Sequence, residues 1–180
     1  MSRTMLITGG ASRLGLSLAT HYTRLGWQVI ITYRTDYPSV STLRTLGVAC
    51  YSVDLLDPQA VLVTAQQIAK EYPRLDVLIH NASAWEADQA GIDNHAVLMR
   101  MMQIHVSAPM LLTEALVPSL ARGEDPSVIL ISDHVAHRGS DQHMALCGKQ
   151  SSHVKSHPIT GKKVCAQSSH QCADPCTARI

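Results

Sequence analysis

Residues Met5-Leu6-Ile7-Thr8-Gly9-Gly10-Ala11-Ser12-Arg13-Leu14-Gly15 decide the fold of this chain. Residues 5–7 form the apolar run of a buried strand, a glycine turn follows, and a helical pattern starts near Leu14. This order is the layout of a dinucleotide-binding unit, in which Gly9 lets backbone N–H groups approach a pyrophosphate at the positive end of the helix. Gly15 lets that helix lie close to the strand. The alternative is a plain strand-to-helix turn that holds no ligand.

The alternation of strand and helix continues along the chain. We expect four more strands, at residues 29–33, 48–53, 77–80 and 128–131. We expect helices at residues 14–25, 38–46, 58–72 and 93–120. Gly26 and Gly47 are placed to end the first two helices, and Pro109 is placed to kink the last. Five alternations predict an α/β fold, a Rossmann-type doubly wound parallel sheet with its site at the carboxyl ends of the strands.

Composition narrows the classes of partner. The 180 residues fit one domain, and a net charge of +1 gives no reason to expect nucleic acid as a partner. No run is apolar enough to span a bilayer, and the N-terminus lacks a secretory pattern. We therefore expect a cytoplasmic protein that acts on a small molecule, without a membrane partner.

The end of the second predicted strand indicates which nucleotide is bound. An acidic residue there usually holds the ribose 2′-hydroxyl of NAD, but this strand ends Tyr33-Arg34-Thr35. A guanidinium beside a hydroxyl attracts a 2′-phosphate, which a carboxylate would repel. The pattern favours NADPH, and the alternative is that Arg34 is a solvated loop residue. Asn81, Ala82 and Ser83 follow the fourth strand, where small residues let a cofactor pass close to the backbone.

The run Thr8-Gly9-x-x-x-Arg13-Leu14-Gly15 resembles the fingerprint Thr-Gly-x-x-x-Gly-x-Gly of the short-chain dehydrogenase/reductase family. Arg13 replaces the middle glycine, as it does in the pteridine reductase branch. The resemblance covers residues 4–146 and is closest to dihydromonapterin reductase-type members. The matching segments are residues 8–19, 33–38, 80–85, 101–106 and 138–143.

The resemblance implies a fold, an activity and a set of contacts. Family members are homo-oligomers, and those of this branch use NADPH to reduce a pterin, here dihydromonapterin or, as a second candidate, dihydrofolate. An aspartate at the position of Asp54 contacts the adenine amino group in the family; a surface turn is the alternative for Asp54. The expected cofactor-binding residues are Gly9, Arg13, Leu14, Gly15, Tyr33, Arg34, Thr35, Asp54, Leu55, Asn81, Ala82 and Ser83.

The catalytic residues that the resemblance implies are incomplete. The family uses a tyrosine as proton donor, a lysine four residues later that lowers the tyrosine pKa, and a serine or aspartate thirteen residues before the tyrosine. Asp133 fits the last position, whereas Leu146 and Gln150 stand at the tyrosine and lysine positions. Leucine has no proton to donate, and glutamine carries no charge to favour a tyrosinate. We expect turnover to be impaired.

The composition changes at the same place. From Cys147 the chain is rich in Ser, Lys, His and Cys, without helical or strand periodicity. Residues 146–152 can be encoded TTA TGC GGC AAG CAA AGC AGC, and deleting one T gives Tyr-Ala-Ala-Ser-Lys-Ala, which restores a tyrosine and a lysine four apart. The synonymous codons were chosen, so this shows compatibility with a frameshift. We expect a domain over residues 1–146 and a disordered, unrelated tail over 147–180.

Three alternatives remain for the function. The chain is an impaired reductase, a catalytically inactive NADP-binding fragment, or a zinc-binding module through Cys165, His170, Cys172 and Cys176. The tail spacing lacks a clean C-x-x-C pair, so no metal site is expected. Ser132 lacks the nucleophile elbow of a hydrolase. Without the family's later elements, much of the usual oligomer interface is missing, and the fifth strand is expected to be an exposed edge.

Overall fold

The computed structural model describes residues 2–85, 94–132 and 165–168 of the chain, the last four by their backbone. Within these residues the elements alternate as a Rossmann fold requires. The strands are β1 (Thr4–Thr8), β2 (Gln28–Tyr33), β3 (Ala49–Ser52), β4 (Val77–His80), β5 (Ser127–Ser132) and β6 (Cys165–Ser168). The helices are α1 (Arg13–Arg24), α2 (Pro38–Thr45), α3 (Pro58–Glu71), α4 (Asn94–Met102) and α5 (Ala108–Leu120), with a π-helical turn, η1 (Gln103–Ser107), between the last two.

The strands form one parallel sheet in the order β3-β2-β1-β4-β5-β6. The strand order reverses between β1 and β4, because the chain first builds outward through β2 and β3 and then returns to the other side of β1. This reversal opens a crevice at the carboxyl ends of the central strands, where open α/β sheets bind ligands. The predicted fold class, a doubly wound parallel sheet, is confirmed.

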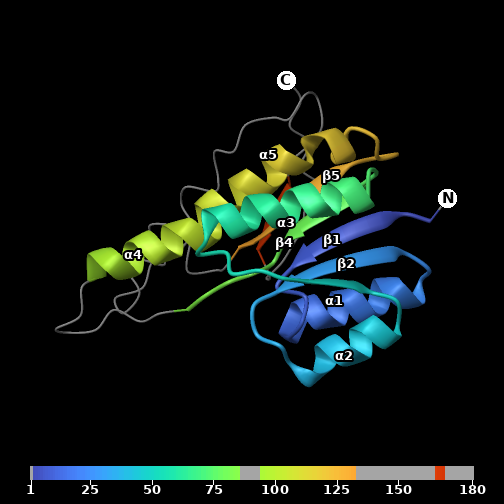
Figure 1. Ribbon diagram of the computed structural model, residues 1–180, viewed down its shortest axis with the longest axis horizontal. Coiled ribbons are helices and arrows are strands. Elements are labelled where there is room, and N and C mark those ends of the chain that lie inside the picture. The colour runs from blue at the N-terminus through green and yellow to red at the C-terminus, as the bar shows by residue number, and fades with distance from the viewer. Residues whose placement is uncertain (1, 86–93, 133–164, 169–180) are drawn as a thin grey trace.

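Helices cover both faces of the sheet (Figure 1). Helices α1 and α2 lie on one face, and α3 and α5 lie on the other. Side chains alternate between the two faces along β1, so Met5 and Ile7 join one core cluster and Leu6 joins the other. Both clusters are buried, which explains why the strands are continuous apolar runs without polar alternation.

Element boundaries agree with the sequence pattern where a local stop signal exists. Gly26 and Gly47 adopt φ values of +80° and +84° just after α1 and α2, the left-handed conformation that favours glycine. Helix α3 begins where Asp57 accepts hydrogen bonds from the backbone N–H groups of Gln59 (2.9 Å) and Ala60 (3.1 Å). No helix among the described residues is long and apolar enough to cross a membrane.

The predicted single helix over residues 93–120 is wrong in its middle. The π-helical turn η1 interrupts it, and the N–H of Ala108 bonds to the carbonyl of Gln103, one residue further back than in an α-helix. In a regular α-helix the ring of Pro109 would clash with the carbonyl of His105, four residues earlier. The wider turn moves that carbonyl away, so the π-helical turn accommodates Pro109 at the start of α5.

The expectation of an exposed fifth strand is also wrong. Strand β6 pairs in parallel with β5, with Ile129 opposite Cys165 and Ser132 opposite Ser168. Residues 165–168 show no strand pattern in the sequence. They can still pair, because an unpaired sheet edge offers backbone N–H and C=O groups that any extended segment can satisfy. The remaining residues of the predicted tail, 147–164 and 169–180, lie outside the described residues.

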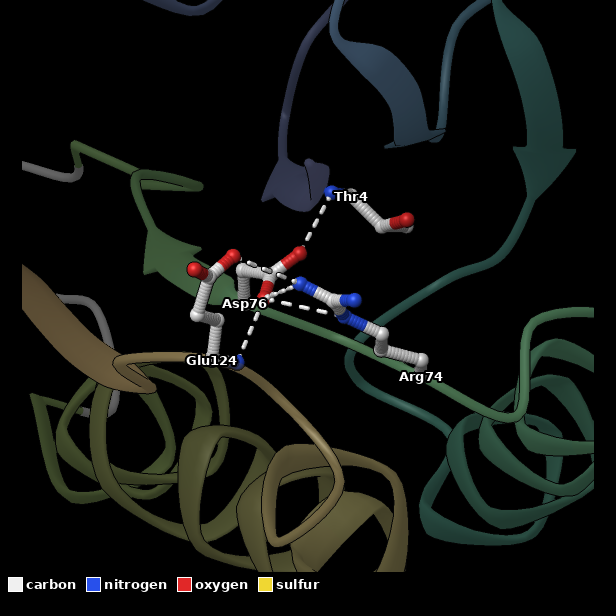
Figure 2. Close-up of polar contacts among 4 residues, drawn as sticks. All are labelled: Thr4, Arg74, Asp76 and Glu124. Carbon is white, nitrogen blue, oxygen red and sulfur yellow. Dashed lines mark hydrogen bonds and ion pairs between the residues drawn. The ribbon is translucent and has the colours of Figure 1, made fainter. Parts of the chain in front are cut away.

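Asp76 joins the amino ends of the strands (Figure 2). Its side chain is 2% exposed and accepts hydrogen bonds from the backbone N–H groups of Thr4 (2.8 Å) and Glu124 (2.9 Å). The guanidinium of Arg74 lies 3.0 Å from the same carboxylate and 3.3 Å from Glu124. Burial alone would raise the pKa of Asp76, but these hydrogen bonds and the arginine charge lower it. We call these four residues the Asp76 network.

Candidate functional site

A cavity of about 440 Å³ lies at the carboxyl ends of the strands. It collects segments that follow β1, β2, β3, β4 and the end of β5, which are far apart in the sequence. Eleven of the twelve residues predicted to bind a cofactor line it. These are Gly9, Arg13, Leu14, Tyr33, Arg34, Thr35, Asp54, Leu55, Asn81, Ala82 and Ser83. Their role as cofactor contacts stays a prediction.

The glycine turn is packed too tightly for side chains. A Cβ atom on Gly9 would lie 2.9 Å from the Cα of Ala82, and the residue has a φ of +66°. Gly15 is the one predicted residue that does not line the cavity; a Cβ there would lie 2.3 Å from the carbonyl oxygen of Gly9. Gly10, which the fingerprint leaves unspecified, would drive a Cβ into Ile31. Gly15 therefore lets the first turn of α1 lie against the glycine turn, and Gly9 and Gly10 let that turn lie against Ala82 and Ile31.

Arg13, which replaces a glycine of the fingerprint, has a backbone conformation that favours glycine. Its φ is +49°, and it is the one non-glycine residue with positive φ in the described part of the chain. A side chain in this left-handed region costs about 1 kcal/mol. The chain thus accepts strain to place a guanidinium-bearing residue on the cavity wall.

Hydrogen bonds from two neighbouring strands fix the turn. The N–H of Gly10 bonds to the carbonyl of Thr32 (3.0 Å), and Asn81 Nδ2 donates to the carbonyls of Thr8 (3.0 Å) and Gly9 (3.2 Å). The hydroxyl of Thr8 in turn accepts from the N–H groups of Asn81 and Ala82, both at 3.0 Å. Asn81 therefore acts as a brace between β1 and β4, in addition to lining the cavity.

The N-terminus of α1 is open towards the cavity. Ser12 stands at the N-cap but makes no side-chain capping bond, and the first turn holds no acidic residue. The first turn of a helix carries N–H groups without intrahelical partners and a partial positive charge, so it favours an anionic group. This arrangement, together with the glycine cradle, fits a pyrophosphate.

The end of β2 supplies the positive charge that the sequence predicted. Arg34 and Thr35 line the cavity, and Arg34 is exposed. Tyr33 is buried, and its hydroxyl accepts a hydrogen bond from Arg44 Nη2 at 2.8 Å. Among the lining residues Asp54 alone is acidic, and its Oδ1 accepts from the N–H of Leu56 (3.0 Å). Asp54 thus closes a turn while it lines the cavity; its contact with the adenine stays a prediction.

Sequence reasoning missed nine lining residues. Ser12, Ala11 and Tyr37 sit inside the quoted motifs and were signalled by proximity to them. Ile104 lies in the matching segment 101–106, but its helical pattern did not indicate that it faces the cavity. The full set is Ala11, Ser12, Thr32, Tyr37, Val53, Ala84, Ile104, Ile131 and Ser132.

The predicted catalytic positions Asp133, Leu146 and Gln150 lie outside the described residues. So do His170, Cys172 and Cys176 of the zinc alternative, and Cys165 is described by its backbone in β6. Within the described part of the chain, no three His, Cys, Asp or Glu residues are grouped to hold a metal ion.

Comparison with known proteins gives consistent matches. The model of a family described as short chain dehydrogenase matches residues 3–147. A dihydromonapterin reductase from Enterobacter sp. (strain 638) is 42% identical over 146 residues, covering 79% of this chain and 60% of the relative. The chain thus spans about 60% of the length of the curated relatives it matches.

Solved structures resemble the fold over most of the chain. A short-chain dehydrogenase from Shigella flexneri 2a, complexed with NADP, gives a TM-score of 0.74 at 27% identity, covering 84% of this chain and 67% of its own. A short-chain dehydrogenase from Streptomyces avermitilis gives a TM-score of 0.75 at 25% identity, covering 83% and 56%. The match of the family model, residues 3–147, includes the segments that form the cavity.

Proposed function

Since the chain belongs to the short-chain dehydrogenase family, we propose that its cavity binds NADPH and that it reduces a pterin slowly. The observation that carries the proposal is the convergence of eleven predicted cofactor-binding residues on one cavity. Relatives at 42% identity named dihydromonapterin reductase support the pterin, and a 27% identical neighbour complexed with NADP supports the nucleotide.

The residues of the cavity divide the work of binding. The open N–H groups of α1 and the cradle around Gly9 hold the pyrophosphate, and Arg34 with Thr35 holds the 2′-phosphate. Arg13 lies at the same turn, and its guanidinium lies near both the pyrophosphate and the pterin. NADPH, when bound, supplies the hydride.

The protein itself must supply the proton for the reaction, and the residues expected to do so are missing. Asp133 matches the polar position of the family motif in the sequence, but Leu146 and Gln150 stand where the proton donor and its lysine are expected. General acid catalysis contributes roughly 10²–10⁴-fold to such reactions, so we expect turnover reduced by about that factor.

Two measurements test the proposal. Titration of the chain by NADPH fluorescence is expected to show saturable binding that is tighter than for NADH, because of the 2′-phosphate. Steady-state NADPH oxidation with dihydromonapterin is expected to be slow, and a chain whose reading frame is restored at codon 146 is expected to regain about 10²–10⁴-fold. Absence of binding by both nucleotides refutes the cofactor, and a restored chain that binds NADPH without reducing pterins refutes the substrate.

A catalytically inactive NADPH-binding protein is the second candidate. Leu146 and Gln150 favour it, because the chain then keeps a binding site without its proton donor. Zero turnover with intact NADPH binding distinguishes it from a slow reductase. Sequencing the locus tests the frameshift: an uninterrupted frame, with no tyrosine and lysine motif in the other frames, removes that explanation. The domain boundary near residue 146 and the cytoplasmic location stay proposals.

A further inference from the structure

The π-helical turn η1 places Ile104 on the wall of the cavity, and its neighbours Gln103 and His105 bond to two residues that line it. Gln103 Nε2 donates to the carbonyl of Leu55 at 3.1 Å. Ile104 lines the cavity and is 6% exposed. His105 Nε2 lies 3.3 Å from the carbonyl oxygen and 3.4 Å from the nitrogen of Ala84, so either neutral tautomer bonds to that residue. Leu55 and Ala84 both line the cavity, the first after β3 and the second after β4.

The residues that make these contacts belong to one π-helical turn. In an α-helix successive side chains turn by about 100°, so three in a row point across more than half a circle. A π-helical turn holds more residues, and the arc between neighbours is narrower. The N–H of Ala108 bonding to the carbonyl of Gln103 marks that wider turn. Gln103 and His105 therefore contact two cavity-lining segments from one turn, with Ile104 between them on the cavity wall.

Two hydrogen bonds fix the segment that follows β3. Asp54 Oδ1 accepts from the N–H of Leu56 at 3.0 Å, and Gln103 holds the carbonyl of Leu55 at the same peptide unit. The first bond is local and forms in any such turn. The second comes from an element 48 residues away and sets the orientation of that peptide relative to the cavity.

We propose that Gln103 is a positioning residue for the adenine half of the nucleotide. It orients the peptide after Leu55 and thereby the cavity wall formed by Asp54 and Leu55. Gln103 does not itself line the cavity, so it acts through Leu55. The inference rests on the proposed function, because it presumes a nucleotide whose adenine half meets this wall.

The test compares Gln103→Met with a matched control. Methionine keeps the length of the side chain but removes the donor. Gln67→Met is the control, because Gln67 Nε2 donates at 2.9 Å to Glu71 on the surface of α3, outside the cavity. Dissociation constants are measured for NADPH, for adenosine 2′,5′-bisphosphate and for reduced nicotinamide mononucleotide, which carry the whole ligand and its two halves.

The expected result is selective. Gln103→Met raises the dissociation constants of NADPH and adenosine 2′,5′-bisphosphate about fivefold, because the Leu55 peptide must then be ordered when the nucleotide binds, and leaves the mononucleotide unchanged. Gln67→Met changes none of the three. Unchanged constants in Gln103→Met, or an equal loss for both halves, overturn the inference.

A ligand-free measurement keeps the inference separate from the proposed function. If the unaltered chain binds neither NADPH nor adenosine 2′,5′-bisphosphate, the proposed function fails. Gln103 is then judged by hydrogen exchange of the amides at residues 54–57. Faster exchange in Gln103→Met than in Gln67→Met supports the positioning role, and equal exchange overturns it.

Discussion

The two ends of the parallel sheet differ in whether a side chain of the protein accepts hydrogen bonds from the backbone N–H groups there. At the amino ends, the Asp76 network supplies a carboxylate that accepts from the N–H groups of Thr4 and Glu124. At the carboxyl ends, α1 begins with no side-chain cap and no acidic residue in its first turn. The amino ends thus hold a negative charge from the protein, whereas the first turn of α1 at the carboxyl ends holds none.

This difference separates stability from binding. The Asp76 network joins segments 72 and 48 residues apart, so it closes the sheet whatever the cavity holds. The cavity end instead contains the strained Arg13 and the uncapped helix. We expect changes at the amino ends to alter the free energy of unfolding, and changes at the carboxyl ends to alter nucleotide affinity.

The largest expected effect in this comparison is that of Asp76→Asn. The amide keeps the shape but loses the charge that pairs with Arg74 and accepts from two N–H groups, so the free energy of unfolding falls by about 3 kcal/mol. Urea denaturation measures this loss. The control is Asp125→Asn, an exposed acid at the same end of the sheet. Weaker NADPH binding by folded Asp76→Asn would contradict the separation of the two ends.

Arg34→Glu tests the cavity end. The substitution removes a charged contact to the 2′-phosphate and adds repulsion, so NADPH affinity falls about 30-fold while NADH affinity changes little. Fluorescence titration with both nucleotides measures this. Arg24→Glu makes the same charge change at the exposed end of α1 and is expected to leave both affinities unaltered. An equal loss for NADH and NADPH would show that Arg34 does not read the phosphate.

Acid is expected to weaken the amino ends selectively. The pKa of Asp76 is lower in the folded chain, so its stabilisation is fully present above the ordinary aspartate pKa of about 4 and is lost as the pH falls through the folded value. The difference in unfolding free energy between the unaltered chain and Asp76→Asn should therefore shrink below about pH 4. A difference that stays constant down to pH 2 would exclude ionised Asp76 as its source.

Arg13→Gly is expected to have the smallest effect, and it should raise the stability of the chain while it lowers the affinity for NADPH. Glycine relieves the positive φ, so the free energy of unfolding rises by about 0.5–1 kcal/mol. The same change removes a guanidinium-bearing residue from the cavity wall, so NADPH binds more weakly. Parallel urea and nucleotide titrations test both signs. A loss of stability would mean that the Arg13 side chain stabilises the turn more than its backbone strains it.

Motifs with a local physical cause were predictable. The glycine turn, Arg34 and Thr35 after β2, and Asn81 after β4 all sit next to strand ends, and the carboxyl ends of parallel strands share one edge. Ile104 and the bond from Gln103 to Leu55 were not predictable, because they depend on a π-helical turn in what reads as one continuous helix. Strand β6 likewise follows from the open edge of β5 and not from its own pattern.

The sequence by itself determined the order of the first five strands and the helices between them, the placement of glycines at the first turn and the positive charge after β2. These depend on periodicity and on backbone freedom, which act between residues close in the chain. Only the tertiary structure decided that Asp76 would accept from Thr4 and Glu124, and that η1 would reach two walls of the cavity. Such contacts form between segments that meet after the sheet is assembled, so no local pattern records them.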